Sequence, residues 1–276
     1  MAAGLAGHWR GFRGVCHKSG QQQPAFYPVP APLRRRIHCQ DCPIRSRTCF
    51  RAFTPDELNY VDKFKKGDLQ ADAGDLVLQE GEASEHLFTL LTGWAFRYKT
   101  LEDGRRQILN YLLPGDFIGL QSSTLGEMDH AVEALGPVSF CVFNRSELYE
   151  LFRTHPGLGY DVTWLASREE RMLDEHLLSI GRRSALERAA YLLAFLHQRA
   201  SVVGAAAGPV GVLPISQQHL ADTLGLSVVH TNKTIRRLIN LNLIRWHDRA
   251  CEVLDLGGLM RAAGWDGFKE QVRPLI

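Results

Sequence analysis

Apolar and polar positions follow different patterns in the two halves of the chain. From Leu69 to Phe143, short apolar runs are separated by glycines roughly ten residues apart, a spacing typical of antiparallel barrels and jelly rolls. From Arg145 onward, apolar residues recur at steps of three and four, which is the period of amphipathic helices. The 276 residues are enough for two domains. We therefore predict an α+β protein with an N-terminal β-roll (jelly roll) and a helical C-terminal half.

A long helix is expected over residues 156–181, because no turn signal interrupts the periodic stretch that begins at Pro156. Its apolar seam predicts pairing with a second copy of the chain. Glu169 and His176 interrupt the seam, and we interpret them as features that weaken permanent pairing. Packing of the helix on its own β-roll is the alternative, and both contacts can exist on different faces. The predicted dimer interface comprises Val162, Leu165, Glu169, Met172, Leu173, His176 and Ile180.

Two short helices separated by a glycine are predicted between Ser216 and Ile239. Ser216 and Ser227 are suited to cap the two helix starts, and Gly225 can adopt the left-handed conformation that ends the first helix. This arrangement is typical of a helix-turn-helix, whose second helix enters the DNA major groove. An ordinary corner of two helices is the alternative. The inner side of the second helix is expected at Val228, Ile235, Leu238 and Ile239, and the DNA-binding residues at Ser227, Val229, His230, Asn232, Lys233, Arg236 and Arg237.

The residues around these two helices favour DNA binding. Residues 243–256 can form a two-stranded wing. Between Ser216 and Arg249, five lysines and arginines stand against two aspartates, although the formal charge of the whole chain is only +2. The positive charge is therefore local, and it has the sign that phosphate contacts require.

The chain is accordingly divided into four parts. Residues 1–35 are rich in Gly, Gln, Pro and Ala without periodicity and are expected to be a disordered arm. A cysteine-bearing loop and the β-roll form a sensor domain over residues 36–155, followed by the dimerisation helix at 156–181 and a winged helix-turn-helix domain at 182–276. No apolar run has the length of a membrane span, and no secretion signal is recognisable. We expect a cytoplasmic protein with no membrane partner, whose thiols stay reduced.

In this order of elements, the chain resembles the CRP/FNR transcription regulators over residues 37–257, and the run Gly115-Asp116-Phe117-Ile118-Gly119 stands where that family has the same residues. The resemblance implies a β-roll of the cyclic-nucleotide-binding type. Members that bind cyclic AMP follow this run with a Glu for the ribose and an Arg-Ser pair for the phosphate. The corresponding positions here are Leu120, His130 and Ala131. Because a neutral imidazole beside an alanine is a poor partner for a buried phosphate, no cyclic nucleotide is expected.

Four of the six cysteines are arranged as in the oxygen-sensing FNR branch of that family. There, three N-terminal cysteines and one from the last β-roll strand hold a [4Fe–4S] cluster, and thiolates suit such clusters because they are soft ligands. The resemblance assigns this role to Cys39, Cys42, Cys49 and Cys141. The same residues can also hold zinc, act as a redox thiol switch or have no function. Cys16 and Cys251 lie outside the set.

The predicted recognition helix departs from the FNR branch. That branch typically shows Glu-x-x-Ser-Arg, whereas the same positions here are Val229, Asn232 and Lys233. Valine cannot accept a hydrogen bond from cytosine as glutamate does, although Lys233 can still reach guanine. A different DNA half-site is therefore expected.

The leading hypothesis is a homodimeric transcription regulator that binds a palindromic operator, contacts RNA polymerase and responds to oxygen or redox state through the cluster. A regulator of the same fold without a cluster, acting by thiol redox chemistry, another ligand or constitutive DNA binding, is the alternative. A third hypothesis is a cyclic-nucleotide-gated enzyme or signalling module. Because the sequence contains no nucleophile elbow, phosphate loop or metalloprotease motif, we do not expect an enzyme.

Overall fold

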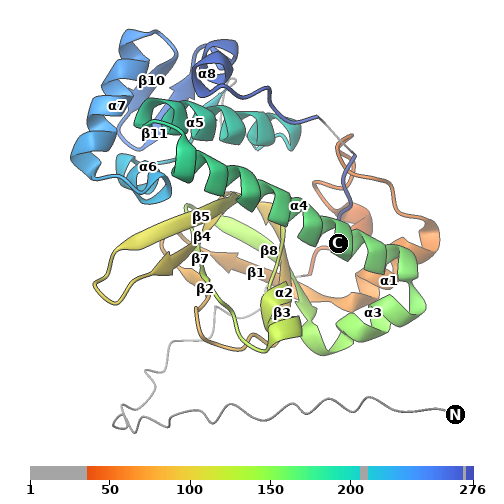
Figure 1. Cartoon of the computed structure of the whole chain (residues 1–276). Coiled ribbons are helices and arrows are strands. Elements are labelled where there is room, and N and C mark those ends of the chain that lie inside the picture. Colours follow the sequence, from red (N-terminus) through yellow and green to blue (C-terminus); the bar gives the residue numbers. More distant parts are fainter. Residues whose placement is uncertain (1–35, 206–210, 270–271) are drawn as a thin grey trace, which may run out of the picture.

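The computed structural model of the chain describes residues 36–205, 211–269 and 272–276 (Figure 1). The arm expected at residues 1–35 lies outside the described residues. The first part of the chain forms, in order, η1 (Cys39–Asp41), α1 (Pro55–Phe64), β1 (Lys65–Ala71), β2 (Leu76–Leu78), β3 (His86–Thr92), β4 (Ala95–Thr100), β5 (Arg106–Leu112), β6 (Phe117–Ile118), α2 (Leu120–Leu125), β7 (Ala131–Ala134), β8 (Val138–Asn144), η2 (Arg145–Glu147) and α3 (Leu148–Thr154). The second part forms α4 (Pro156–Arg182), α5 (Ala185–Val202), β9 (Val212–Leu213), α6 (Gln217–Leu224), α7 (Val228–Asn240), β10 (Ile244–His247), β11 (Ala250–Val253) and α8 (Leu256–Ala263).

Two antiparallel sheets form the predicted β-roll. Their strand orders are β1-β8-β3-β6 and β2-β7-β4-β5. Apolar side chains of both sheets, among them Phe88, Val132 and Phe140, are buried between them. The turn between β4 and β5 contains Gly104 at φ +83°, a conformation that glycine adopts without steric cost. The predicted β-roll is therefore confirmed.

The long helix α4 crosses the β-roll, with α6 and α7 at one end and α1 and α3 at the other (Figure 1). The helices α5 and α8 pack against each other beyond α4. A small sheet of order β10-β11-β9 includes the predicted wing, because β10 pairs antiparallel with β11. None of the helices in the described ranges is long and apolar enough to cross a membrane.

The buried face of α4 is the seam that the sequence analysis assigned to a dimer interface. Val162, Leu165, Met172 and His176 are each at most 8 % exposed within the single chain. The chain's own β5 and α5 pack against α4, so these four side chains do not reach a second copy. Their assignment to the dimer interface is wrong.

The fifth member of that seam, Glu169, is also occupied within the chain. Its carboxylate pairs with Arg97 of β4 and accepts a hydrogen bond from the Asn110 side chain of β5 at 2.9 Å. Burial opposes the charge, but Arg97, the hydrogen bond from Asn110 and the charge of Arg199 together outweigh it and lower the pKa of Glu169. Glu169 is therefore an internal ion-pair partner, and its predicted role in weakening a dimer is wrong.

The exposed side of α4 carries a different apolar stripe. Ala166, Leu173 and Leu177 lie on it at helical spacing, followed by the half-buried Ile180. Leu173 is 39 % exposed and Leu177 is 72 % exposed. Of the predicted interface residues, Leu173 and Ile180 thus remain accessible to a partner.

Candidate functional site

The starts of α6 and α7 and the end of α6 lie where their capping residues predict them. The Ser216 hydroxyl accepts a hydrogen bond from the His219 amide at 3.1 Å, and the Ser227 hydroxyl accepts one from the His230 amide at 3.2 Å. Gly225 follows α6 at φ +66°, where a side chain would be strained. These features fix the angle between α6 and α7 and so position the outer face of α7.

The outer face of α7 presents most of the predicted DNA-binding residues to solvent. Asn232 is the exception, because it is half-buried in a groove that Gln217, Trp246 and Asp248 also line. Among the described residues, no carboxylate pairs with the lysine or arginines of this face. The exposed predicted residues are Ser227, Val229, His230, Lys233, Arg236 and Arg237.

The inner face of α7 differs in part from the expected set. Ile235 and Leu238 are buried as predicted, but Val228 and Ile239 are 36 % and 37 % exposed. Thr231 and Thr234 occupy the buried positions instead. The Thr234 hydroxyl donates to the His230 carbonyl at 3.0 Å, which allows a polar side chain to lie on the buried side.

The first helix of this pair, α6, is docked on the β-roll. Arg106 of β5 pairs with Asp222 at 3.0 Å. The Gln107 side chain donates to the Thr223 carbonyl at 2.9 Å, and the Tyr111 hydroxyl lies 3.0 Å from the Thr223 hydroxyl. The sensor and the DNA-binding helices are therefore in direct polar contact.

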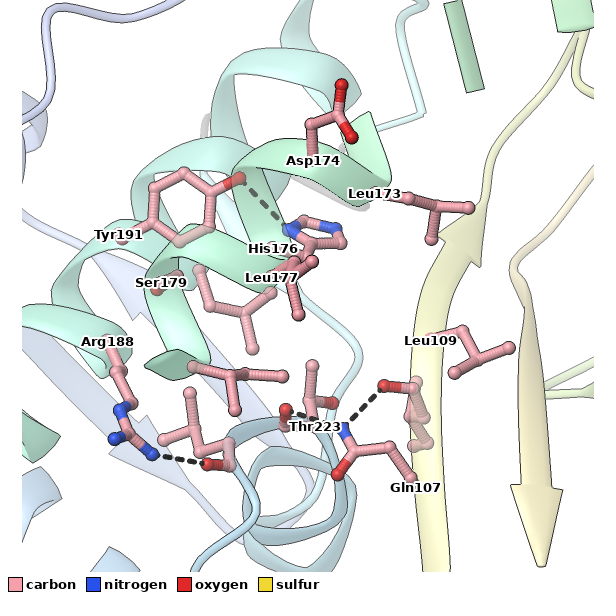
Figure 2. Close-up of a pocket in the computed structure, with 14 residues that line it drawn as sticks. Gln107, Leu109, Leu173, Asp174, His176, Leu177, Ser179, Arg188, Tyr191 and Thr223 are labelled. Carbon is pink, nitrogen blue, oxygen red and sulfur yellow. Dashed lines mark hydrogen bonds between the residues drawn. The ribbon is translucent and has the colours of Figure 1, made fainter. Parts of the chain in front are cut away.

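A largely apolar cavity of about 290 Å³ lies at this junction, between α4, β5, α5 and α6. Figure 2 shows Leu173, His176 and Leu177 of α4 on one side and Gln107 and Thr223 on the other. The Tyr191 hydroxyl closes one wall through a 3.0 Å contact with the His176 imidazole. Leu173 and Leu177, which are exposed on α4, thus also line the cavity between the β-roll and the DNA-binding helices.

Three of the predicted ligand cysteines line a second, much smaller cavity. Cys39 in η1 and Cys42 just after it face Cys141 of β8 across a space of about 20 Å³. This volume holds about one water molecule. Leu275 and Ile276 are also among the residues that line it. Segments about a hundred residues apart in sequence are thus brought together at one point.

The surroundings of this cavity hold the cysteine loop on the β-roll. The Cys39 amide donates to the Asp62 carboxylate at 2.7 Å. The buried Lys65 ammonium donates to the Ile37 carbonyl at 2.7 Å and pairs with Asp68 at 2.6 Å. Burial raises the pKa of the Cys39 and Cys141 thiols to about 12, and the charge of Lys65 acts in the opposite direction.

Cys49 belongs to the same loop, but it is not among the described residues that line the cavity. It is half-buried against the main hydrophobic core, and its carbonyl accepts a hydrogen bond from the Arg273 amide at 2.9 Å. Within the described ranges, no three His, Cys, Asp or Glu side chains are arranged to hold a metal ion. The structure therefore brings three of the four cysteines together without forming a complete ligand set.

Asp116, inside the GDFIG run, holds a buried cluster of arginines that the sequence analysis missed. Its carboxylate lies 2.5 Å from Arg199 of α5, 2.8 Å from Arg273 and 3.4 Å from Arg168 of α4. Burial raises the pKa of Asp116, but the three guanidinium groups outweigh this effect and hold it far below the usual range. The partners lie 52 to 157 residues away in sequence, so no local pattern indicates them.

At the position that the resemblance compares with a phosphate ligand, His130 is buried. Burial, helped by the nearby charge of Arg97, lowers the pKa of His130 to about 3. The imidazole is therefore neutral near pH 7 and offers no fixed positive charge to a phosphate. The nearby Arg97 is already paired with Glu169.

Comparisons with known proteins match both halves of the chain. Residues 69–155 match the model of the cyclic nucleotide-binding domain, and residues 187–262 match the Crp-like helix-turn-helix domain. The chain is 32 % identical to the nitrogen fixation regulation protein FixK of Bradyrhizobium diazoefficiens over 72 % of this chain and 83 % of that protein. It is 30 % identical to the transcriptional activator protein FnrL of Cereibacter sphaeroides over 87 % of this chain and 96 % of that protein.

A solved structure agrees with these sequence matches. The structure of FixK2 from Bradyrhizobium japonicum superposes with a TM-score of 0.63 at 25 % identity, covering 71 % of this chain and 96 % of that one. The arrangement of β-roll, long helix and helix-turn-helix is therefore shared with this solved structure.

Proposed function

Because the chain belongs to the CRP/FNR family of DNA-binding transcription regulators, which are not enzymes, we propose that it is a homodimeric regulator whose DNA affinity responds to oxygen or redox state through a [4Fe–4S] cluster. The observation that carries this proposal is the meeting of Cys39 and Cys42 with Cys141 at one cavity. Relatives named FnrL and, in Haemophilus influenzae, anaerobic regulatory protein support it. The proposed role places the protein in the cytoplasm, with operator DNA and RNA polymerase as partners.

The chemistry of the donor set fits an iron–sulfur cluster. The proposed ligands are Cys39, Cys42, Cys49 and Cys141, and a bound cluster would supply a redox-active group sensitive to oxygen. Thiolate, not thiol, binds metal. Burial raises the pKa of the Cys39 and Cys141 thiols to about 12, and the charge of Lys65 opposes this rise only in part, so cluster binding would have to release their protons. The space of about 20 Å³ is too small for the cluster while Leu275 and Ile276 line it.

A thiol switch without a cluster is less well supported by the same site. Two of its thiols are buried, and burial raises their pKa to about 12, whereas oxidation-sensitive cysteines have low pKa values and are accessible. The absence of a bound cyclic nucleotide remains a prediction, supported by the neutral, buried His130 and by the Arg97–Glu169 pair.

The dimer is proposed to use the exposed stripe of α4. Ala166, Leu173, Leu177 and Ile180 lie at successive steps of seven, four and three residues, which keep them on one face of the helix, as in a helix–helix seam. The two α7 helices of such a dimer would read two half-sites about one DNA turn, roughly 34 Å, apart. The sequence-reading roles are proposed for Val229, His230 and Lys233, and the phosphate contacts for Ser227, Arg236 and Arg237.

The cluster is tested by anaerobic purification followed by a visible spectrum and by iron and sulfide assays. The wild type is expected to contain about four irons and four sulfides per chain, as a cubane cluster requires. A cysteine-to-serine substitution at any one of the four proposed ligands should abolish iron binding. The variants Cys16→Ser and Cys251→Ser should still bind iron. Iron-free protein after anaerobic reconstitution, or iron content unaffected by Cys141→Ser, would contradict the proposal.

A further inference from the structure

Residues 273–276 leave the DNA-binding part of the chain and lie on the sensor domain (Figure 1). The Arg273 amide donates to the Cys49 carbonyl, and the Arg51 amide donates to the Arg273 carbonyl, both at 2.9 Å. These bonds form a parallel bridge between Phe50 and Arg273. The segment is thus joined to the cysteine loop.

The side chain of Arg273 anchors this segment in the β-roll. Its guanidinium donates to the Gly115 carbonyl at 2.7 Å and to the Asp116 carboxylate at 2.8 Å. It also lies over the Phe50 ring, 5.4 Å from the centroid. Gly115 is at φ +87°, and a Cβ there would come within 2.4 Å of the Phe50 ring. The GDFIG run therefore forms the seat for this anchor, because only glycine permits the close approach of Phe50.

Beyond the anchor, the segment forms part of the lining of the cysteine cavity. Leu275 and Ile276 are 5 % and 3 % exposed and line the same space as Cys39, Cys42 and Cys141. The Thr89 hydroxyl donates to the Ile276 carbonyl at 2.5 Å. Thr89 is the register partner of Cys141 between β3 and β8, so the segment is held directly beside the thiol of the rigid strand.

The same anchor connects the segment to the helices that lead to the DNA-binding domain. Asp116 accepts Arg273 together with Arg199 of α5 and Arg168 of α4. Arg199 also donates to the Tyr111 carbonyl at 2.8 Å. Withdrawal of Arg273 removes one of three positive charges around a single buried carboxylate, which changes the interactions of α4 and α5 at that point.

We propose that residues 273–276 are an intramolecular plug that occupies the cysteine cavity of the cluster-free chain, so that plug docking and cluster binding exclude each other. The part concerning the cluster rests on the proposed function. Release of the plug frees Asp116 from Arg273, and this couples the occupancy of the cavity to α4 and α5.

The first test uses metal-free protein and needs no cluster. Deletion of residues 272–276, and separately Leu275→Asp, should increase the rate of alkylation of Cys39 and Cys141 by iodoacetamide at least tenfold, because the thiols become accessible. Val272→Asp is the matched control, since Val272 is 63 % exposed and lies outside the cavity. Equal alkylation rates in the wild type, the deletion variant, Leu275→Asp and Val272→Asp would overturn the proposal of a plug.

The second test compares loaded and metal-free wild type, so it does not depend on the folding of a variant. Hydrogen–deuterium exchange of the peptide that contains residues 273–276 should be at least tenfold faster after anaerobic reconstitution, and the deletion variant should take up iron faster than the wild type. Equal exchange in loaded and metal-free protein would overturn the plug. Iron-free protein in every preparation, with the alkylation difference retained, would refute the proposed cluster and support the segment as the cover of the thiols.

Discussion

The helices α4 and α7 both carry apolar residues at three- and four-residue steps, but their buried faces meet different kinds of partner. The inner face of α7 meets α6 and α5, and α6 precedes it by a three-residue turn. The inner face of α4 instead includes Glu169 and His176, which meet polar side chains of distant strands and of α5. Periodicity therefore identifies the buried face of a helix, whereas the identity of the partner that covers this face follows only from the contacts in the folded chain.

The polar residues of α4 show why the seam was assigned to a dimer. A carboxylate and an imidazole within an apolar stripe look like interruptions when no partner is known. In the structure, Glu169 meets Arg97 and Asn110, and His176 meets the Tyr191 hydroxyl at 3.0 Å. Buried polar groups are stable only when they are paired, and these partners make the seam an internal surface.

The largest effect is expected from removing the carboxylate that ties α4 to the sensor domain. Asp116→Ala leaves Arg168, Arg199 and Arg273 without their common buried partner, so the free energy of unfolding should fall by about 3–5 kcal/mol. Arg236→Ala, on the exposed face of α7, should change it by less than about 0.5 kcal/mol. Urea unfolding of both variants measures the contrast, and similar losses in the two would contradict the assigned role of Asp116.

The second-largest effect is expected from Glu169→Leu, which tests directly whether the buried face of α4 is an internal surface or a dimer interface. Glu169→Leu leaves Arg97, whose side chain is 11 % exposed, without its partner and should destabilise the chain by about 3 kcal/mol. The double variant Arg97→Met, Glu169→Leu should recover most of the loss, since no unpaired charge remains. Denaturant unfolding of the single and double variants gives the answer. An unchanged stability together with tighter dimerisation of Glu169→Leu would restore the original dimer interpretation.

The exposed stripe of α4 should instead control association. Leu177→Glu places two like charges at a symmetric seam and is expected to weaken dimerisation at least thirtyfold, or about 2 kcal/mol. Leu125→Glu is the matched control, because Leu125 of α2 is also 72 % exposed. Sedimentation of both variants separates the outcomes: equal dimer content in the two would place the interface elsewhere.

The sequence predicts interactions between residues that are close along the chain better than interactions between residues that are far apart. The caps at Ser216 and Ser227 and the turn at Gly225 are local features, and the structure has all three where the sequence predicts them. The meeting of Cys39 with Cys141 was implied by the family resemblance. The docking of residues 273–276 was not predictable, because four residues carry no periodicity and Arg273 meets Asp116 across 157 positions.

The smallest effect concerns the outer face of α7, where exposure alone does not distinguish a base contact from a phosphate contact. Lys233→Ala should cost about 1–3 kcal/mol of DNA binding and relax the preference at one base pair, because a base contact carries discrimination. Arg237→Ala should weaken binding to all sequences alike and reduce the dependence on salt, because a phosphate contact carries none. Selection from a randomised-site library, repeated at two salt concentrations, measures both properties. If Lys233→Ala lowers affinity but selects the same sequence as the wild type, Lys233 contacts phosphate, and base reading on this helix falls to Val229 and His230.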